Sequence, residues 1–294
     1  MRSDLAYWVT LHNVRGMGPA TFRKLLDAYG EPAKAVLEGQ RRHLAMMPRI
    51  PITVVDAILA ARDHVEEAEA QIADLAQRGV KILTMRDPGY PEPLRRIPSP
   101  PPVLYCLGEL TEADTRGAGI VGSTNPSAHG ADMANRFARV LARHGHTIVS
   151  GYARGIDSAA HQGALTARGR TVLVIPTGIS RFESHQGFPS PQALARHGAI
   201  ISEQPPDVFW TVEGALSRNR ITVALSRALL VVETKDEGGT MHTFNIARKE
   251  GRPVFVMAYR HPPPSASGNK RAIERGATPI GTFADIKKIL ETLE

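Results

Sequence analysis

The chain has 294 residues, 42% of them hydrophobic and 22% charged, and its formal net charge at pH 7 is +7. This length suits one large domain with a smaller partner, and no apolar run reaches the roughly 18 residues that a membrane-spanning helix needs. The single cysteine, Cys106, excludes an internal disulfide and a thiolate-rich zinc site.

Cysteine usage and charge also indicate a compartment and a partner. The lone cysteine suits a reducing compartment, and Asp4 and His12 make the start unlike a secretory signal. With no apolar run long enough to span a membrane, we therefore expect a cytoplasmic protein without membrane association. Residues 1–80 hold ten basic and ten acidic side chains, so the whole positive excess falls in residues 81–294. Because excess Lys and Arg neutralise phosphates and release counterions, nucleic acid is the leading candidate partner. An ordinary basic surface is an equal alternative on charge alone.

Residues 1–80 predict a small all-helical domain. Helices are expected at LAYWVTLHNV, at GPATFRKLLDAYG with Pro19 near its start and Gly30 after its end, and in one long segment over residues 53–78. The turn VRGMGPA, at 14–20, resembles that of a helix-hairpin-helix or SAM-like domain, whose backbone N–H groups can contact phosphates. A structural corner is the favoured alternative, because this domain carries no net charge.

Residues 81–294 predict a second domain, and the proline-rich segment 86–102 forms the entry of the chain into it. From Gly117 onward, runs rich in Val, Ile and Leu, such as TVLVIP and ALLVVE, alternate with helical patterns. Runs with little polar alternation are typical of parallel strands covered on both faces. The fold class predicted is therefore α/β, with an extended Rossmann-type, doubly wound and mostly parallel sheet.

Three glycine-containing turns follow predicted strands of this domain. The stretch TIVSGYARGIDSAAH at 147–161 ends a strand in a turn that opens directly into a helix, and the loop GSTNPS at 122–127 and the turn EGGT at 237–240 have a similar layout. Freed backbone N–H groups and the helix dipole favour anions there, so the turns together predict a phosphate-bearing ligand along one sheet edge. The predicted phosphate contacts are Gly122, Ser123, Thr124, Ser127, Gly151, Arg154, Gly155, Gly238, Gly239 and Thr240.

The block SRNR places two cations at the start of an apolar helix. Arginines oppose the helix dipole there, so Arg218 and Arg220, with Asn219 between them, need a phosphate ligand or a carboxylate partner. Glu203 and Glu233 are the candidate carboxylates. Phosphate binding and a structural ion pair are equal alternatives for either arginine, and the prediction adopted for Arg218, Asn219 and Arg220 is phosphate binding.

Other chemistries are disfavoured. GAGIVG at 117–122 matches G-x-G-x-x-G, but its glycines precede and include a strand instead of following one, so no dinucleotide cofactor is expected. Asp157 and His161 lie four residues apart on one helix face, yet helix capping and packing are favoured over a metal pair or an acid–base pair. The sequence has no nucleophile elbow, Cys–His arrangement or Walker lysine, so we expect neither a metal nor catalytic residues.

The order of these blocks resembles the DNA-processing protein A family, also called Smf. The match runs through LHNVRGMGPATFRKLLDAYG, DPGYPEPLRRIPSPPPVLYCLG, GIVGSTNPSAHG, IVSGYARGIDSAAHQGAL and SRNRITVALS, and covers nearly the whole chain. The resemblance implies a helical domain joined to an extended Rossmann domain that forms a homodimer and binds single-stranded DNA. It also implies protection of incoming strands in natural transformation and loading of a RecA-type recombinase.

The chain departs from the family's usual pattern at the candidate site. Thr124 stands where the family usually has arginine, and Leu216 and Glu213 stand where an aromatic residue and a lysine are common. Base stacking and phosphate pairing are the main sources of single-strand affinity, so both are expected to be weaker.

Two alternative functions stay open. One is a nucleotide or nucleotide-sugar sensor or hydrolase, for which Glu233, Glu237 and Asp157 are the acid–base candidates. The other is an interaction scaffold that docks the recombinase without binding DNA.

Overall fold

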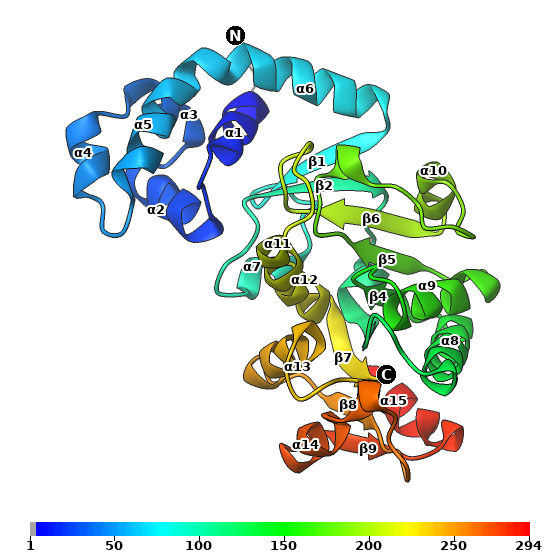
Figure 1. The fold of residues 1–294 in the computed structure, drawn as a ribbon. Helices are drawn as coiled ribbons and strands as arrows, with labels where there is room; N and C mark the ends of the chain where they lie inside the picture. The colour runs from blue at the N-terminus through cyan, green and yellow to red at the C-terminus, as the bar shows by residue number, and fades with distance from the viewer. Residues whose placement is uncertain (1–3) are drawn as a thin grey trace. The chain divides into compact units, whose positions relative to one another are not determined.

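The computed structural model describes residues 4–294, so the first three residues of the domain predicted over 1–80 lie outside the described residues. The chain divides into two units (Figure 1). The helical unit comprises residues up to Tyr90 and Arg95–Tyr105, and the sheet unit comprises Pro91–Leu94 and Cys106–Glu294. Between residues 4 and 294, no helix is long and apolar enough to cross a membrane.

The helical unit packs short helices around buried aromatic side chains. Trp8 stacks on Phe22 with ring centroids 5.3 Å apart, and Leu25 and Ile58 are buried. The long helix expected over 53–78 is instead two helices, separated by a 3-10 turn at Ala61–His64. The elements of the helical unit are α1 (Asp4–Asn13), α2 (Pro19–Tyr29), α3 (Pro32–Glu38), α4 (Arg41–Met46), α5 (Ile52–Ala60), α6 (Val65–Gln77) and β1 (Val80–Thr84). The strand β2 (Val103–Gly108) continues along the chain into the sheet unit.

Within Cys106–Glu294, every residue of which is described, seven strands form a parallel array in the order β6-β5-β4-β3-β7-β8-β9. The chain adds β4, β5 and β6 outward from one side of β3 and then returns to place β7 on its other side. This reversal confirms the doubly wound prediction, and such a switch point leaves a crevice at the carboxyl ends of the strands. The strands are β3 (Gly117–Val121), β4 (Ile148–Ser150), β5 (Thr171–Val174), β6 (Gly198–Ser202), β7 (Ser226–Val231), β8 (Val254–Met257) and β9 (Thr278–Ile280).

Helices cover both faces of this sheet, which is why its strands read as continuous apolar runs. Successive side chains of β3 enter different cores: Ile120 packs with Phe137 and Ile289, whereas Val121 packs with Phe244. Figure 1 shows α8 and α9 on one side of the sheet and α12 and α13 on the other. The helices are α7 (Glu92–Arg96), α8 (Ala128–Arg143), α9 (Ile156–Thr166), α10 (Pro191–Ala195), α11 (Val212–Ser217), α12 (Asn219–Ala224), α13 (Gly239–Lys249), α14 (Asn269–Glu274) and α15 (Ile286–Leu293).

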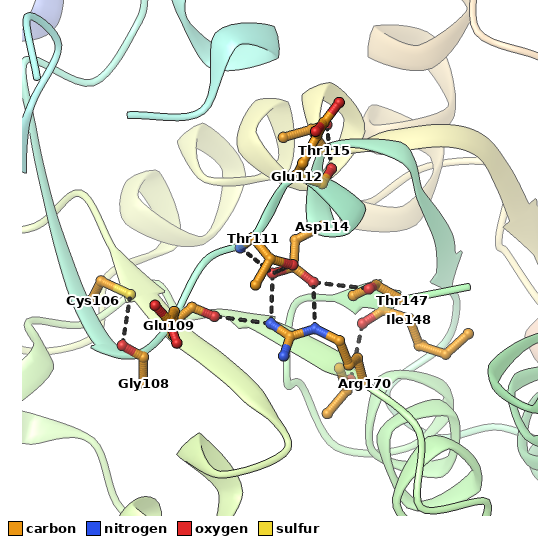
Figure 2. Close-up of polar contacts among 11 residues, drawn as sticks. Cys106, Gly108, Glu109, Thr111, Glu112, Asp114, Thr115, Thr147, Ile148 and Arg170 are labelled. Atoms are coloured by element: carbon orange, nitrogen blue, oxygen red, sulfur yellow. Dashed lines mark hydrogen bonds and ion pairs between the residues drawn. The ribbon is translucent and has the colours of Figure 1, made fainter. Parts of the chain in front are cut away.

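A buried carboxylate ties together the amino ends of three neighbouring strands (Figure 2). Asp114, in the turn before β3, accepts hydrogen bonds from the Thr111 backbone N–H at 2.8 Å and the Thr147 hydroxyl at 2.8 Å. Arg170, just before β5, donates to the same carboxylate from Nε at 3.1 Å and from Nη2 at 2.7 Å. Because donors that precede β3, β4 and β5 all bond to this one carboxylate, it holds the starts of the three strands in register.

We expect Asp114→Ala to lower the free energy of unfolding by about 2–4 kcal/mol, because the Thr111 N–H and the Thr147 hydroxyl lose their acceptor and Arg170 keeps only the Glu109 carbonyl. Urea denaturation followed by circular dichroism measures this loss. Glu112→Ala is the matched control: its side chain lies in the same turn but is 90% exposed, so a loss below about 0.5 kcal/mol is expected. Equal losses in the two variants would contradict the anchoring role.

Candidate nucleic-acid interface

The loops that follow β3, β4 and β5 line a cavity of about 610 Å³, together with α11 and the start of α13. A second hollow of about 530 Å³ adjoins it and shares some of its wall. Predicted residues that line the first cavity are Gly122, Thr124, Gly151, Arg154, Arg218, Asn219, Gly239 and Thr240. Predicted residues that line only the second hollow are Ser123, Ser127 and Gly238. The structure thus brings together turns that lie more than 100 residues apart, and leaves Gly155 and Arg220 outside both hollows.

The first loop, residues 122–127, is held in place by hydrogen bonds to the buried carboxylate of Glu233. This carboxylate is fully buried and accepts hydrogen bonds from the Ser127 N–H at 2.9 Å, the Ser127 hydroxyl at 2.5 Å and the Tyr259 hydroxyl at 3.1 Å. Ser127 in turn caps α8 by accepting from the Gly130 N–H at 3.0 Å. Glu233 therefore supports the loop, and it neither pairs with the SRNR arginines nor lines the cavity.

The second loop, residues 151–155 between β4 and α9, packs directly against the first. Gly155 has φ +80°, and a Cβ there would lie 2.4 Å from the Ser123 carbonyl oxygen, so only glycine fits this close approach. The Ile156 N–H donates to the same carbonyl at 3.1 Å. Gly155 thus joins the two loops, while the exposed Arg154 of the second loop lines the cavity.

Arg218 lies beneath the second loop as a buried cation, with only 6% of its surface exposed. Its Nη2 donates to the Gly151 carbonyl at 2.8 Å and lies 4.0 Å from an Asp157 carboxylate oxygen, and its Nη1 donates to Asn219 Oδ1 at 3.1 Å. Burial raises the pKa of the Asp157 carboxyl, and the Arg218 guanidinium opposes that rise. Because arginine stays protonated, the cavity wall keeps a cation that water hardly screens.

Arg220 has a different environment from its neighbour two residues away. Its two terminal nitrogens each lie 2.6 Å from an oxygen of Glu203, in a two-pronged ion pair in which both side chains are mostly buried. Of the two alternatives for the SRNR arginines, a phosphate ligand or a carboxylate partner, Arg220 therefore has the carboxylate partner. Its guanidinium anchors the start of α12 to the end of β6 and is not among the groups that line the cavity.

The third turn, residues 237–240, has open space around its two glycines at the start of α13. Gly238 has φ +117°, and a Cβ on Gly238 or on Gly239 would meet no atom within 4 Å. Asn219 Nδ2 donates to the Gly239 carbonyl at 3.4 Å, which links this turn to the base of the second loop. An anion can therefore approach the first N–H groups of an 11-residue helix without steric hindrance.

The cavity wall also contains residues that the sequence analysis did not select. Arg181 and Phe182 reach it from the loop after β5, and Trp210 reaches it from the segment after β6. The signal for Trp210 was present in the sequence as two consecutive aromatic residues inside a loop, DVFWT. Leu216 and Thr124, where the family pattern has an aromatic residue and an arginine, line the cavity as expected.

No cluster of three or more His, Cys, Asp or Glu that could hold a metal ion occurs within residues 4–294. His161 is fully buried, and its Nδ1 lies 2.6 Å from the Thr171 hydroxyl. Burial, and then the positive charge of Arg218 and of His185, lower the pKa of His161 from 6.5 to about 3. A neutral, packed imidazole agrees with the favoured structural interpretation of the Asp157–His161 pair.

Comparison with known proteins identifies related chains. The family model described as DNA recombination-mediator protein A matches residues 81–294. The chain is 32% identical over 282 residues to protein Smf of Synechocystis sp., covering 95% of this chain and 70% of that protein. It is 33% identical over 216 residues to DNA processing protein DprA of Bacillus subtilis, covering 73% of each.

Two solved structures share the fold. DNA processing protein A of Streptococcus pneumoniae gives a TM-score of 0.79 at 26% identity, covering 96% of this chain and 97% of that chain. DNA processing protein A of Helicobacter pylori, described for its unique single-stranded DNA binding mode, gives a TM-score of 0.63 at 27% identity. That second match covers 72% of this chain and 96% of the H. pylori chain.

We expect Gly151→Ala to lower the free energy of unfolding by about 1–3 kcal/mol, because the added methyl group forces buried atoms apart. A Cβ on Gly151 would lie 1.6 Å from Arg218 Nη1. Gly239→Ala is the control from the same cavity, where the methyl group would enter open space. Thermal and urea denaturation compare the two variants, and an equal change in both would mean that Arg218 does not constrain the loop.

Protonation of His161 should destabilise the protein in acid. The folded state keeps the imidazole neutral down to about pH 3, whereas the unfolded chain binds this proton below pH 6.5. The free energy of unfolding therefore falls as pH drops through this window, by about 1.4 kcal/mol per pH unit from this group. Denaturation curves at successive pH values give the free energy of unfolding as a function of pH, and this function should have a shallower slope for His161→Asn than for the wild type. The exposed His43 provides the control His43→Gln, and the same shallow slope there would contradict the assignment.

Proposed function

Because the chain belongs to the DNA recombination-mediator protein A family, we propose that it binds single-stranded DNA and mediates recombination during DNA uptake, without catalysis. The observation that carries this proposal is the cavity at the strand switch point, where open backbone turns and the cations Arg154 and Arg218 meet. Phosphates are the groups that such turns and cations attract in common.

The proposed contacts divide into ligand-facing and supporting groups. Arg154, Thr124 and Thr240 face the cavity, with backbone N–H groups at Gly122 and at the Gly238–Gly239 turn. Supporting residues act beneath them: Ser127 caps a helix, Gly155 joins two loops and Arg220 pairs with Glu203. The buried Arg218 holds Gly151 and supplies positive charge from below.

The disposition of the acidic groups supports binding over turnover. Glu233 is committed to three donors under the first loop, and Asp157 lies beside Arg218. General acid–base catalysis needs a carboxyl group that reaches the substrate. Of the three acid–base candidates, Asp157 lines the large cavity but is buried beside Arg218, Glu237 lines the smaller hollow only, and Glu233 lines neither.

A nucleotide-sensing function is the second candidate. A concave cavity of about 610 Å³ lies in the usual size range for small-molecule sites, and its wall combines cations with aromatic side chains. Native mass spectrometry of the purified protein would detect a bound nucleotide. A retained nucleotide without affinity for single strands would favour the sensor.

Self-association as a homodimer and docking of a RecA-type recombinase belong to the same proposal, and family membership supports them. Sedimentation velocity tests the first. Retention of the recombinase by the immobilised protein, with and without an oligonucleotide, tests the second and separates DNA-dependent recruitment from the scaffold alternative.

We expect tight single-strand binding that weakens steeply with salt, measured by fluorescence anisotropy of a labelled oligo(dT) with duplex DNA as competitor. Loss of one phosphate contact in Arg154→Ala should weaken binding about 5- to 10-fold and reduce the slope of log affinity against log salt by about 0.7. Arg143→Ala, an exposed arginine at the end of α8 that does not line the cavity, should bind like the wild type. Absent binding, or no preference for single strands, would refute the proposed function.

A further inference from the structure

Two consecutive aromatic side chains project into solvent at the rim of the cavity. Phe209 is 67% exposed and Trp210 is 59% exposed, and Trp210 lines the cavity itself. Large aromatic side chains usually gain by being buried, so an exposed pair beside a cavity indicates a surface that becomes covered by a ligand or partner.

The backbone on both sides of this pair is pinned. On the upstream side, the Gly178 N–H donates to the Val208 carbonyl at 2.8 Å and the Ser180 N–H donates to the Pro206 carbonyl at 3.0 Å. On the downstream side, the Thr211 hydroxyl caps α11 by accepting from the Gly214 N–H at 2.9 Å. Only two residues lie between these fixed points. The rings are therefore presented on an ordered backbone, and a ligand that stacks on them loses less entropy in ordering the site.

A cation accompanies the aromatic pair. The Arg181 guanidinium carbon lies 4.4 Å from the centre of the Phe209 ring. Arg181 Nε donates to the Asp207 carbonyl at 3.2 Å and lies 3.9 Å from an Asp207 carboxylate oxygen, so the contacts with Asp207 use Nε and leave the two terminal nitrogens for a ligand. The Arg181 side chain is 44% exposed and also lines the cavity. An arginine stacked on an aromatic ring keeps its outward charge available to an anion while the ring remains open on its other face.

We propose that Phe209, Trp210 and Arg181 form the base-stacking subsite for the single strand whose phosphates are bound by the cavity. The inference rests on the proposed function and names the residues that hold the bases. The chemistry of the patch favours nucleobases, because flat rings next to cations and open backbone turns match the alternation of base and phosphate along a strand. The subsite also supplies the aromatic surface and the cation that Leu216 and Glu213 do not provide.

Trp210 offers a direct readout. The chain has two tryptophans, and Trp8 is buried against Phe22 in the helical unit. Titration of the full chain with oligo(dT) should therefore quench the emission of Trp210 and protect it from acrylamide. Trp210→Phe should abolish most of the quenching but keep affinity within about threefold, because phenylalanine still stacks.

Affinity measurements separate stacking from apolar contact. Trp210→Leu keeps apolar bulk but removes the aromatic face, and should weaken oligo(dT) binding about 5- to 100-fold with an unchanged salt slope. Phe209→Leu should also weaken it. Met46→Ala is the control, since Met46 is an apolar side chain that is 75% exposed and lines neither hollow; less than a twofold change is expected. Arg181→Gln should reduce the salt slope, as the loss of a phosphate contact does.

The outcomes distinguish this inference from the function on which it rests. Wild-type protein that does not bind single strands removes the proposed function, and this inference with it. Tight wild-type binding with neither Trp210 quenching nor a loss in Trp210→Leu overturns the inference alone. Loss of self-association in Trp210→Leu, seen by sedimentation velocity, would assign the patch to a protein interface and also overturn it. Quenching by thymidine monophosphate equal to that by oligo(dT) would assign the subsite to a free nucleotide.

Discussion

The buried guanidinium of Arg218 links the parts from which the cavity is built. One nitrogen holds the Gly151 carbonyl of the second loop, and another contacts Asn219, whose amide reaches the Gly239 carbonyl of the third turn. The first loop joins the assembly through Gly155, which packs on the Ser123 carbonyl. Three turns from distant parts of the chain are thereby set around one hollow. Because the cation is desolvated and only loosely paired with Asp157, it also biases that hollow toward anions.

The carboxylates of the sheet unit do structural work at both ends of the strands. Asp114 ties the amino ends of β3, β4 and β5, whereas Glu233 supports the first loop at the carboxyl ends. Glu203 neutralises Arg220. With these acids engaged in the scaffold, the cavity wall carries three arginines against two carboxylates, Asp157 and Glu183. The same arrangement favours phosphate binding and disfavours acid–base chemistry.

The chemistry of the cavity wall depends on where the fold places each side chain. The sequence lacks an arginine at Thr124 and an aromatic residue at Leu216, and both positions line the cavity in the structure. Arg181 and Trp210, from two other loops, line the same cavity. The fold thus places a cation and an aromatic ring at the cavity from positions in the chain other than those of the family motif. The order of a linear motif does not by itself show whether such a site has lost affinity.

Local patterns in the chain were enough to predict the parallel sheet and the glycine turns that follow its strands. Those features follow from local patterns: apolar runs covered on both faces, and glycines where a strand turns into a helix. Which side chains face the cavity depends instead on contacts between distant segments of the folded chain. Arg218 and Arg220 share one motif, yet one contacts Gly151 and the other Glu203, because each meets a different neighbouring strand end. Trp210 joins the site for the same reason, since the contacts that place it connect segments well separated in the chain and leave no local periodic signal.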